Sequence, residues 1–400
     1  MNGNFEKARP MLPAAEENAG SRQPLKIALV APLVAPIAPP FLGGAQAVIH
    51  DLARGLARRG HEVTLFAANG SHLEAVEPPA GGGRLCVVEV AVQPGELKAI
   101  DLSAGSDAPG TVADAAFFRQ GELFLQIYLM INRQEKGFQI THSHAFDWPA
   151  FALAPLSRVP AVHTVHLPSL DPRINAVLKT ACRQTGSIGA VTVSKACAAT
   201  YARHFSFDRV IYNGIDTAQI PFSGQGQGYL LFAGRMSPDK GPDLAIALAR
   251  RAGRRLVLAG GIYNQEYFQS RIVPELSKGN LEYRGALQRA ELYRLMSGAD
   301  GVLFPSRLEE AFGLVLVEAL AAGAPVIGWI RGAVPEIVEH GRHGFLLPYL
   351  DMDGAAEAIG KLPQINRWEC RRRVEERFSL ASMLDQYEHY YREVIDRCPH

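Results

Sequence analysis

The sequence holds few cysteines, and their spacing indicates no structural pair. The five cysteines are widely separated and none falls in a C-x-x-C pattern. A disulfide framework and a structural zinc site are therefore not indicated, and a reducing cytoplasm is the expected location. No apolar run reaches 18 residues, which argues against a transmembrane helix. The first 23 residues lack the apolar core of a signal peptide, so we expect a disordered tail there.

An excess of charge of one sign is also lacking. Lys and Arg number 41 against 40 Asp and Glu, which gives a net charge of +1. A strongly basic face for nucleic acid is therefore not indicated. No G-x-G-x-x-G motif follows the first strand of either half, which argues against an NAD enzyme. The chain has 400 residues, of which 48% are hydrophobic, enough for two or three globular domains.

The hydrophobic pattern repeats a strand–helix–strand unit in both halves of the chain. Residues 25–33 form an apolar strand, a helix then begins near Gly43 and stops at Gly60, and residues 63–67 form the next strand. Residues 228–261 restart the same order. Such units are typical of a parallel sheet with helices on its faces. We expect an α/β protein with two doubly wound, Rossmann-like domains that face each other across a cleft.

Composition marks the boundaries of these domains. The segment 215–228 is rich in Pro, Gly, Ser and Gln, which suits a linker. Residues 70–135 show a helical pattern only at 115–133. We predict a tail at 1–23, an N-terminal domain at 24–218, a C-terminal domain at 219–377 and a final amphipathic helix within 378–400. This helix could pack on either domain, which includes crossing back to the N-terminal one.

Two glycines stand where the first helix begins. Gly43 and Gly44 lie in the run FLGGAQ, directly before the helical pattern. The start of a helix favours phosphate, and glycine lets a ligand approach the backbone closely. A plain tight turn is an equally good interpretation of this feature alone.

Two cations follow the first strand of the C-terminal half. Arg235 and Lys240 lie in AGRMSPDKG, between the strand and its helix. A guanidinium fork and an ammonium point charge at this place suit a diphosphate. The alternative is an ordinary solvated loop.

Two histidines end a strand in the segment THSHAFDW. We expect His142 and His144 to point to opposite faces, so that they do not jointly bind a metal. His144 is nearer the carboxyl end of the strand and is the candidate for the cleft. A hydrogen-bonded structural histidine is the alternative.

Two carboxylates eight residues apart occupy an apolar segment after a later strand. Gly313 precedes a helix that ends at Gly323, so Glu310 lies in the loop before this helix and Glu318 just over one turn inside it. Two acceptors near one helix start suit sugar hydroxyls. The alternative is a capping carboxylate at Glu310 and a core ion pair at Glu318.

A second acidic motif resembles a metal site, but we do not interpret it as one. Asp351 and Asp353 form a D-x-D pattern after a late strand, directly before a helical segment. We interpret one of them as the N-cap of that helix rather than as a metal ligand.

Together these segments resemble glycosyltransferase family 4, whose members are retaining enzymes with the GT-B fold. The resemblance covers about residues 25–395 and is most specific in AGRMSPDKG, in GVLFPSRLEEAFGLVLVEALAAGAPVIG and in GAVPEIVEHGRHGFLL. The E-x7-E spacing selects Glu310, since Glu309 would pair with Val317. Ala311 after the doubled glutamate departs from the usual pattern, and a solvated loop is expected for Glu309.

The resemblance implies roles for the candidate residues. Arg235 and Lys240 would neutralise the leaving diphosphate. Glu310 would hold the transferred sugar, Glu318 the ribose, and His144 the reacting face of the donor. Further donor contacts are implied at Gly43, Gly44, Leu287, Phe312, Gly313 and Leu314.

The implied activity is transfer of a sugar from a nucleotide-diphosphate sugar, with a UDP-sugar favoured, to an acceptor hydroxyl. The anomeric configuration would be retained, and neither a metal nor another cofactor would be needed. The N-terminal domain would bind the acceptor, which would be a sugar, a natural product or a glycan. A nucleotide-sugar epimerase, a phosphorylase and a non-enzymatic binding subunit remain as alternatives. Membrane contact is not indicated, and a monomer or a homodimer is expected.

Overall fold

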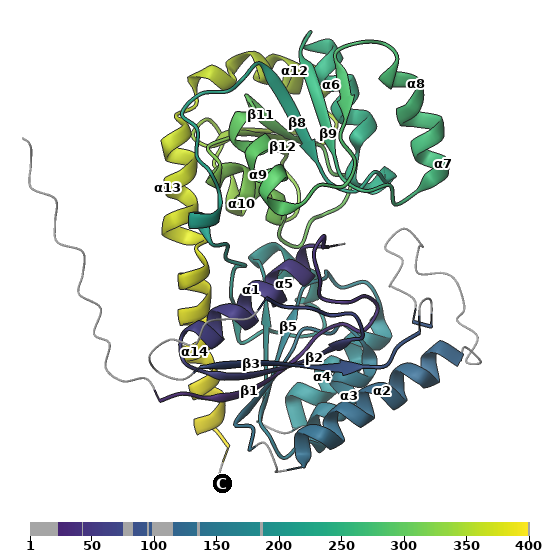
Figure 1. Ribbon diagram of the computed structural model, residues 1–400, viewed down its shortest axis with the longest axis vertical. Helices are drawn as coiled ribbons and strands as arrows, with labels where there is room; N and C mark the ends of the chain where they lie inside the picture. The colour runs from purple at the N-terminus through teal and green to yellow at the C-terminus, as the bar shows by residue number, and fades with distance from the viewer. Residues whose placement is uncertain are drawn as a thin grey trace, which may run out of the picture.

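Two lobes make up the molecule in the computed structural model of Figure 1, which describes residues 23–41, 43–74, 83–93, 96–97, 115–133, 137–184 and 187–398. Each lobe is built on one parallel sheet. The strand orders are β3-β2-β1-β4-β5-β6-β7 and β10-β9-β8-β11-β12-β13. The predicted α/β class with two parallel sheets is confirmed, whereas the predicted tail falls almost entirely outside the described residues.

The first lobe contains the expected strand–helix–strand unit. Its strands are β1 (Lys26–Val30), β2 (Glu62–Ala68), β3 (Arg84–Val90), β4 (Ile140–Ser143), β5 (Ala161–Val165), β6 (Ile188–Thr192) and β7 (Arg209–Val210). Its helices are α1 (Gly44–Arg58), α2 (Ala115–Asn132), α3 (Trp148–Leu153), α4 (Pro172–Gln184) and α5 (Lys195–Tyr201).

The helix predicted at residues 115–133 is confirmed by α2, but strand β3 was not predicted. This strand pairs only with β2, at one edge of the sheet. Six of its seven residues are partly or fully exposed, so the burial that would produce a clear sequence signal is missing.

The second lobe repeats the arrangement. Its strands are β8 (Tyr229–Ala233), β9 (Arg255–Ala259), β10 (Leu281–Tyr283), β11 (Gly301–Phe304), β12 (Val326–Trp329) and β13 (Gly344–Leu347). Its helices are α6 (Pro242–Arg251), α7 (Gln265–Tyr267), α8 (Val273–Leu276), α9 (Arg289–Gly298), α10 (Leu314–Ala321), α11 (Val334–Ile337), α12 (Met352–Lys361) and α13 (Arg367–Arg377). Strands β8, β11 and β12 are fully buried, which accounts for their continuous apolar runs.

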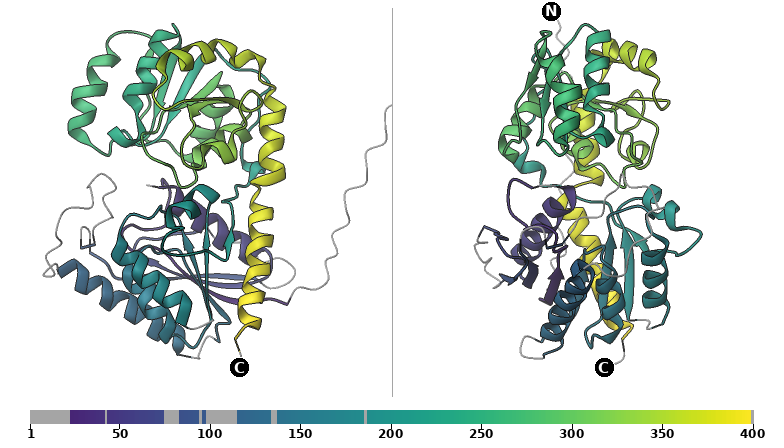
Figure 2. Two further views of the ribbon diagram at one scale, coloured as in Figure 1. Left: turned by 180° about the vertical axis from the view of Figure 1, so that it is seen from behind. Right: turned by 90° about the vertical axis from the view of Figure 1, so that its right-hand side faces the viewer.

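The last helix, α14 (Leu380–Asp396), leaves the second lobe and packs on the first. Figures 1 and 2 show α13 beside the second lobe, where it packs on α10, and α14 running beside the first sheet. Tyr387, Tyr390 and Tyr391 are fully buried there. The Tyr391 hydroxyl lies 2.6 Å from His142 Nδ1, and the Tyr387 hydroxyl lies 2.9 Å from Thr164 Oγ1. Helix α14 is therefore part of the core of the first lobe.

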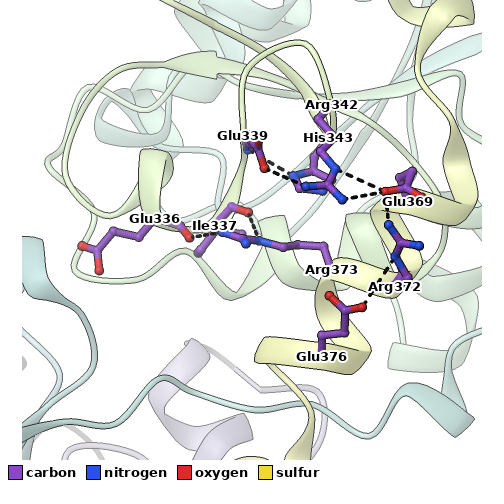
Figure 3. A network of polar contacts seen from close by, with 9 residues as sticks. All are labelled: Glu336, Ile337, Glu339, Arg342, His343, Glu369, Arg372, Arg373 and Glu376. Carbon is purple, nitrogen blue, oxygen red and sulfur yellow. Dashed lines mark hydrogen bonds and ion pairs between the residues drawn. The ribbon is translucent and has the colours of Figure 1, made fainter.

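Helix α13 also contacts α11 and the segment between α11 and β13, as Figure 3 shows. Arg373 donates to the backbone carbonyl oxygens of Glu336 and Ile337 at 2.9 and 3.3 Å. Arg342 and Arg372 both pair with Glu369. The side chain of Glu336 points away from this network, which leaves its carboxylate for the first lobe.

Replacing Tyr387 by alanine is expected to destabilise the first lobe by about 3–5 kcal/mol, the usual cost of truncating a buried aromatic side chain. Chemical denaturation followed by circular dichroism measures this loss. His389→Ala, at an exposed position of the same helix, is the matched control and should change the free energy of unfolding little. A loss below 1 kcal/mol for Tyr387→Ala would contradict the packing of α14.

Candidate active site

Four sequence motifs lie just after the four strands where the two sheets reverse their strand order. In the first sheet β1 neighbours β4, and in the second β8 neighbours β11. Gly44 and His144 follow β1 and β4, while Lys240 and Glu310 follow β8 and β11. Ligands of open parallel sheets bind beyond the carboxyl ends of strands at such reversals. The topology therefore places these four motifs at the two positions where a ligand is expected.

Lys240 and Glu310 form the polar centre of the second lobe. Lys240 Nζ donates to Glu310 Oε1 at 2.6 Å, and the Ser306 hydroxyl donates to the same oxygen at 2.8 Å. Both charged side chains are largely buried, at 22% and 13% exposure. An ammonium group has three donors. Lys240 can therefore hold Glu310 and still donate to an anion.

The loop that carries Arg235 and Lys240 is held against the segment that follows β11. Arg307 donates to both carboxylate oxygens of Asp243, at 2.9 and 2.7 Å. Gly241 has a φ of +72°, and a β-carbon there would lie 2.4 Å from the carbonyl oxygen of Pro305, so only glycine fits. Arg235 lies 4.5 Å from the ring centre of Tyr263 and 3.3 Å from Asp239. The loop thus presents Arg235 and Lys240 from a rigid base.

The starts of helices α1 and α10 meet between the lobes. Gly43 is the N-cap of α1, and its N–H donates to the Gln46 side chain at 3.0 Å. A β-carbon at Gly44 would lie 3.7 Å from Leu314 Cβ. Leu314, the first residue of α10, packs against the apolar cores of both lobes. Gly43 and Gly44 are themselves exposed, so two helix starts from different lobes face one region.

The remaining predicted donor contacts lie in the second lobe. Gly313 caps α10 with a φ of +94°, a conformation that favours glycine. The Phe312 side chain is buried in the apolar core, so a ligand could meet only its backbone. Leu287 is partly buried against the same core, beyond β10.

Glu318 lies inside α10 and is almost fully buried. Its Oε1 accepts a hydrogen bond from the Tyr293 hydroxyl at 3.1 Å. Burial raises the pKa of Glu318 to about 7, although Arg289 and the Tyr293 hydroxyl act in the opposite direction. A buried carboxylate with a neutral donor is costly to ionise. Glu318 is therefore unlike Glu310, which has a cation in direct contact.

The expectation that His142 and His144 point to opposite faces is wrong. Their ring centres are 4.0 Å apart, because side chains two residues apart on a strand share one face. The two ring nitrogens of His142 are hydrogen-bonded to the hydroxyls of Tyr391 and Thr164 in the core. His144 Nδ1 lies 2.8 Å from His166 Nε2.

His166, to which no role was assigned from the sequence, is the more accessible of the two paired histidines. It follows β5 and is partly exposed, whereas His144 is only 2% exposed. His144 Nε2 has no hydrogen-bond partner among the described residues. Burial lowers the pKa of His166 to about 4 and that of His144 well below its usual value. Both rings are therefore neutral at pH 7.

The other acidic candidates play no part in this region. Glu309 is 61% exposed and lies 3.5 Å from Arg331, as expected for a solvated loop. Asp351 is the N-cap of α12 and accepts from the Gly354 N–H at 3.0 Å, which confirms the capping interpretation. Asp353 pairs with Arg251 at 2.6 Å. Within the described ranges, no group of three or more His, Cys, Asp or Glu side chains is arranged to hold a metal ion.

The lobes are joined by polar contacts that the sequence did not reveal. Arg289 of α9 donates to both oxygens of Asp51 on α1, at 3.0 and 2.8 Å. The Glu336 carboxylate accepts from the N–H groups of Lys195 and Ala196 at 2.9 and 2.7 Å. Ser194 donates to the carbonyl of Ala311, directly after Glu310. The spacing of Arg289 and Tyr293, four residues apart on one helix, was the available signal, but their partners lie in distant segments.

Two family models match adjoining parts of the chain. The model described as "Glycosyltransferase Family 4" matches residues 42–219, and that described as "Glycosyl transferases group 1" matches residues 216–377. Within the described part of the chain, no helix has the length and hydrophobicity needed to cross a bilayer.

Similar proteins include several glycosyltransferases. A glycogen synthase from Mycobacterium tuberculosis is 28% identical over 80% of this chain and 82% of its own length. A D-inositol 3-phosphate glycosyltransferase from Mycolicibacterium smegmatis is 27% identical over 85% and 83%. The crystal structure of a glycosyltransferase involved in avilamycin A biosynthesis has a TM-score of 0.65 at 25% identity, covering 93% of this chain and 98% of that one.

Two further solved structures share the fold. Sucrose-phosphate synthase from Thermosynechococcus elongatus has a TM-score of 0.73 at 19% identity, over 93% of this chain and 100% of that one. Anabaena HepE in complex with UDP-glucose has a TM-score of 0.65 at 18% identity, over 92% and 100%.

The buried carboxylate of Glu318 predicts a pH dependence of stability. Its folded-state pKa of about 7 lies above the ordinary value of 4.5, so the folded protein binds this proton more tightly than the unfolded chain. Glu318 therefore weakens folding progressively as pH rises from 4.5 to 7. Glu318→Gln should gain stability relative to the wild type between pH 5 and pH 8, by up to about 3 kcal/mol.

Thermal and chemical denaturation at both pH values, without nucleotide, measures the gain. Glu309→Gln, at an exposed carboxylate, is the control and should follow the wild type at each pH. An equal effect of Glu318→Gln at pH 5 and pH 8 would show that Glu318 is ionised throughout this range.

Proposed function

Since the chain belongs to glycosyltransferase family 4 and has the GT-B fold, we propose that it is a retaining, metal-independent hexosyltransferase. As a glycosyltransferase, it moves a sugar from a nucleotide sugar to an acceptor. The proposal adds the stereochemistry, the independence of metal, and the roles of individual residues.

One observation carries this proposal: the glycine-rich start of α1 lies against the start of α10, beside Lys240 and Glu310. Gly44 comes from the first lobe and Leu314 from the second, and their contact joins the two halves of the site. Helix starts favour anions because their N–H groups are free to donate. A diphosphate between the two starts would meet N–H groups from both lobes and the cations of one.

Arg235 and Lys240 stabilise the leaving diphosphate in this proposal. Negative charge grows on the β-phosphate as its bond to the sugar breaks. Positive groups held in place before the reaction stabilise such charge without reorganisation. Arg235 rests on Tyr263, and Lys240 rests on Glu310. These contacts fix both cations in the loop after β8, and they take over the charge neutralisation that a divalent cation would otherwise supply.

The two glutamates divide the donor between them. Glu310 lies in the loop after β11 and contacts Lys240 of the loop after β8, so we assign it to a hydroxyl of the transferred sugar. Glu318 lies deeper, inside α10 and beside Tyr293. A carboxylate there accepts from the ribose hydroxyls, which offer two adjacent donors.

The histidine pair is assigned to the sugar on the side of the first lobe. His166 is the accessible ring and contacts the substrate, while His144 supports it from the interior. This assignment keeps His144 in the site but gives the direct contact to His166. The two rings are neutral, so they act as hydrogen-bond partners and not as a cation.

The reaction then needs no side chain as a base. The bond between the anomeric carbon and the β-phosphate oxygen breaks, and its electron pair leaves with the diphosphate. The acceptor oxygen bonds to the same face of that carbon, which retains the configuration. The proton of the acceptor hydroxyl passes to an oxygen of the leaving phosphate.

A UDP-sugar is the proposed donor, and a sugar, natural product or glycan the acceptor. Support comes from HepE, whose structure was solved with UDP-glucose, and from the glycogen synthase and avilamycin relatives. The first lobe would bind the acceptor, and the cytoplasm is the proposed location.

A panel of UDP-, GDP- and ADP-sugars, scored for nucleotide release with and without sugar acceptors, tests the activity. We expect release from one donor that is unchanged by EDTA. Lys240→Ala should lower kcat about 100-fold or more, the usual cost of losing one donor to developing negative charge. Lys278→Ala, at an exposed ion pair remote from the site, should leave kcat unchanged. Release that EDTA abolishes and Mn²⁺ restores would overturn metal independence.

Glu310→Ala and Glu318→Ala are expected to fail in different ways. Loss of Glu310 should reduce turnover strongly and leave nucleotide affinity nearly intact. Loss of Glu318 should mainly weaken nucleotide binding. Steady-state kinetics with calorimetry of nucleotide binding separates the two effects, with Glu309→Ala as the control. The reverse pattern would show that the roles are exchanged.

A further inference from the structure

A continuous polar chain connects helix α1 of the first lobe with Glu318 of the second. Arg289 donates from both terminal nitrogens to Asp51. Its Nε donates to the Tyr293 hydroxyl at 3.0 Å, and that hydroxyl donates to Glu318 Oε1 at 3.1 Å. Four residues from three helices thus form one directed series of hydrogen bonds.

The direction of this chain is fixed by its chemistry. A tyrosine hydroxyl has a single proton. Because Tyr293 accepts from Arg289 Nε, its own proton is free for Glu318. A guanidinium donates only and an ionised carboxylate accepts only, so the order from Arg289 through Tyr293 to Glu318 is fixed when Glu318 is ionised. The Glu318 carboxylate therefore has one oxygen held by Tyr293 and the other available for a ligand.

Asp51 keeps the guanidinium of Arg289 turned toward the first lobe. Both partners are largely buried, at 11% and 25% exposure. Burial alone would raise the pKa of Asp51, but hydrogen bonds from His50 and Arg289 outweigh it and hold the pKa below its usual value. The Arg289 guanidinium also lies over the rings of Phe41 and Tyr293, at 5.4 and 5.8 Å. The ion pair is thus charged and sterically enclosed.

Without Asp51, Arg289 would be a buried cation beside a buried carboxylate. Breaking a buried pair by removing one partner leaves the other charge uncompensated. The nearest compensation is Glu318, two hydrogen bonds away. A guanidinium that turned to Glu318 would occupy the oxygens needed for a ribose.

We propose that Asp51, Arg289 and Tyr293 are positioning residues that set Glu318 for ribose hydroxyls only when α1 is docked on α9. Nucleotide recognition in the second lobe thereby depends on the contact that the first lobe makes with it. This inference rests on the proposed contact between Glu318 and the ribose, and it adds the residues that control that contact.

Contacts that only hold the two lobes together, called a clasp below, would affect nucleotide affinity in a different way. The Glu336 contacts with Lys195 and Ala196 also join the lobes, and they have no connection to Glu318 among the described residues. Weakening a clasp would lower affinity for every nucleotide equally. Weakening the polar chain of Asp51, Arg289, Tyr293 and Glu318, called the relay below, would specifically reduce the preference for a ribonucleotide over its 2′-deoxy counterpart.

The experiment measures Kd by calorimetry for UDP, 2′-deoxy-UDP, GDP and 2′-deoxy-GDP, with the wild type and three variants. Of UDP and GDP, the wild type should bind one more tightly. The Kd of that ribonucleotide should be about tenfold or more lower than the Kd of its 2′-deoxy counterpart, as expected for a hydrogen bond to a carboxylate. Tyr293→Phe and Asp51→Asn, which preserve shape, should each reduce this preference to below about threefold. Tyr229→Phe removes a hydroxyl that donates to Leu295 of the same helix α9, and should keep the wild-type preference.

The outcomes separate the two proposals. A wild type without ribose preference would remove the proposed role of Glu318, and the relay with it. A wild-type preference that both variants retain within twofold would overturn the relay and leave the proposed function standing. Equal loss of affinity for ribo- and deoxyribonucleotides would overturn it as well, since the contacts would then only join the lobes. Circular dichroism melts confirm that each variant is folded.

Discussion

The cost of burying charge where the two lobes meet constrains the whole site. An ionised group removed from water must be paired or lose its charge. Lys240 is paired with Glu310, Arg289 with Asp51, and Glu336 with two backbone N–H groups. Glu318 is the exception, with a neutral tyrosine hydroxyl as its hydrogen-bond partner. Among these carboxylates, Glu318 is therefore the one whose pKa is raised by burial.

This difference explains how two glutamates from one motif acquire different properties. Glu310 lies in a loop, where a lysine from the neighbouring strand end reaches it directly. Glu318 lies on the inner face of α10, where α9 supplies only Tyr293 and the arginine behind it. A ligand with two hydroxyl donors would supply hydrogen bonds that the buried carboxylate of Glu318 otherwise lacks. A ligand that brings negative charge is better placed beside Lys240 and Arg235.

Much of this arrangement could be predicted because parallel sheets bring the ends of their strands together. The motifs at Gly44, Lys240 and Glu310 follow strands that adjoin an order reversal, so their grouping follows from topology. The Asp51–Arg289 pair could not be found, because it depends on how the two lobes dock. The pairing of His144 with His166 was missed although β4 and β5 are consecutive strands, because the strand order within the sheet was not predicted. The misjudged faces of His142 and His144 had a different cause, a misapplied strand period.

The connection between the lobes determines what closure can move. The chain crosses from one lobe to the other at Ile215 and returns at Ser379, and these crossings are paired with each other. Ile215 N–H donates to the Phe378 carbonyl at 3.0 Å, and Leu380 N–H donates to Ile215 at 2.8 Å. A β-carbon at Gly214 would lie 2.4 Å from the Ser379 carbonyl oxygen, so the two segments are in close contact. Because α14 is anchored in the first lobe and α13 in the second, a rotation of the lobes would have to take place at this short paired crossing. Such a rotation would separate Asp51 from Arg289 without disturbing either sheet.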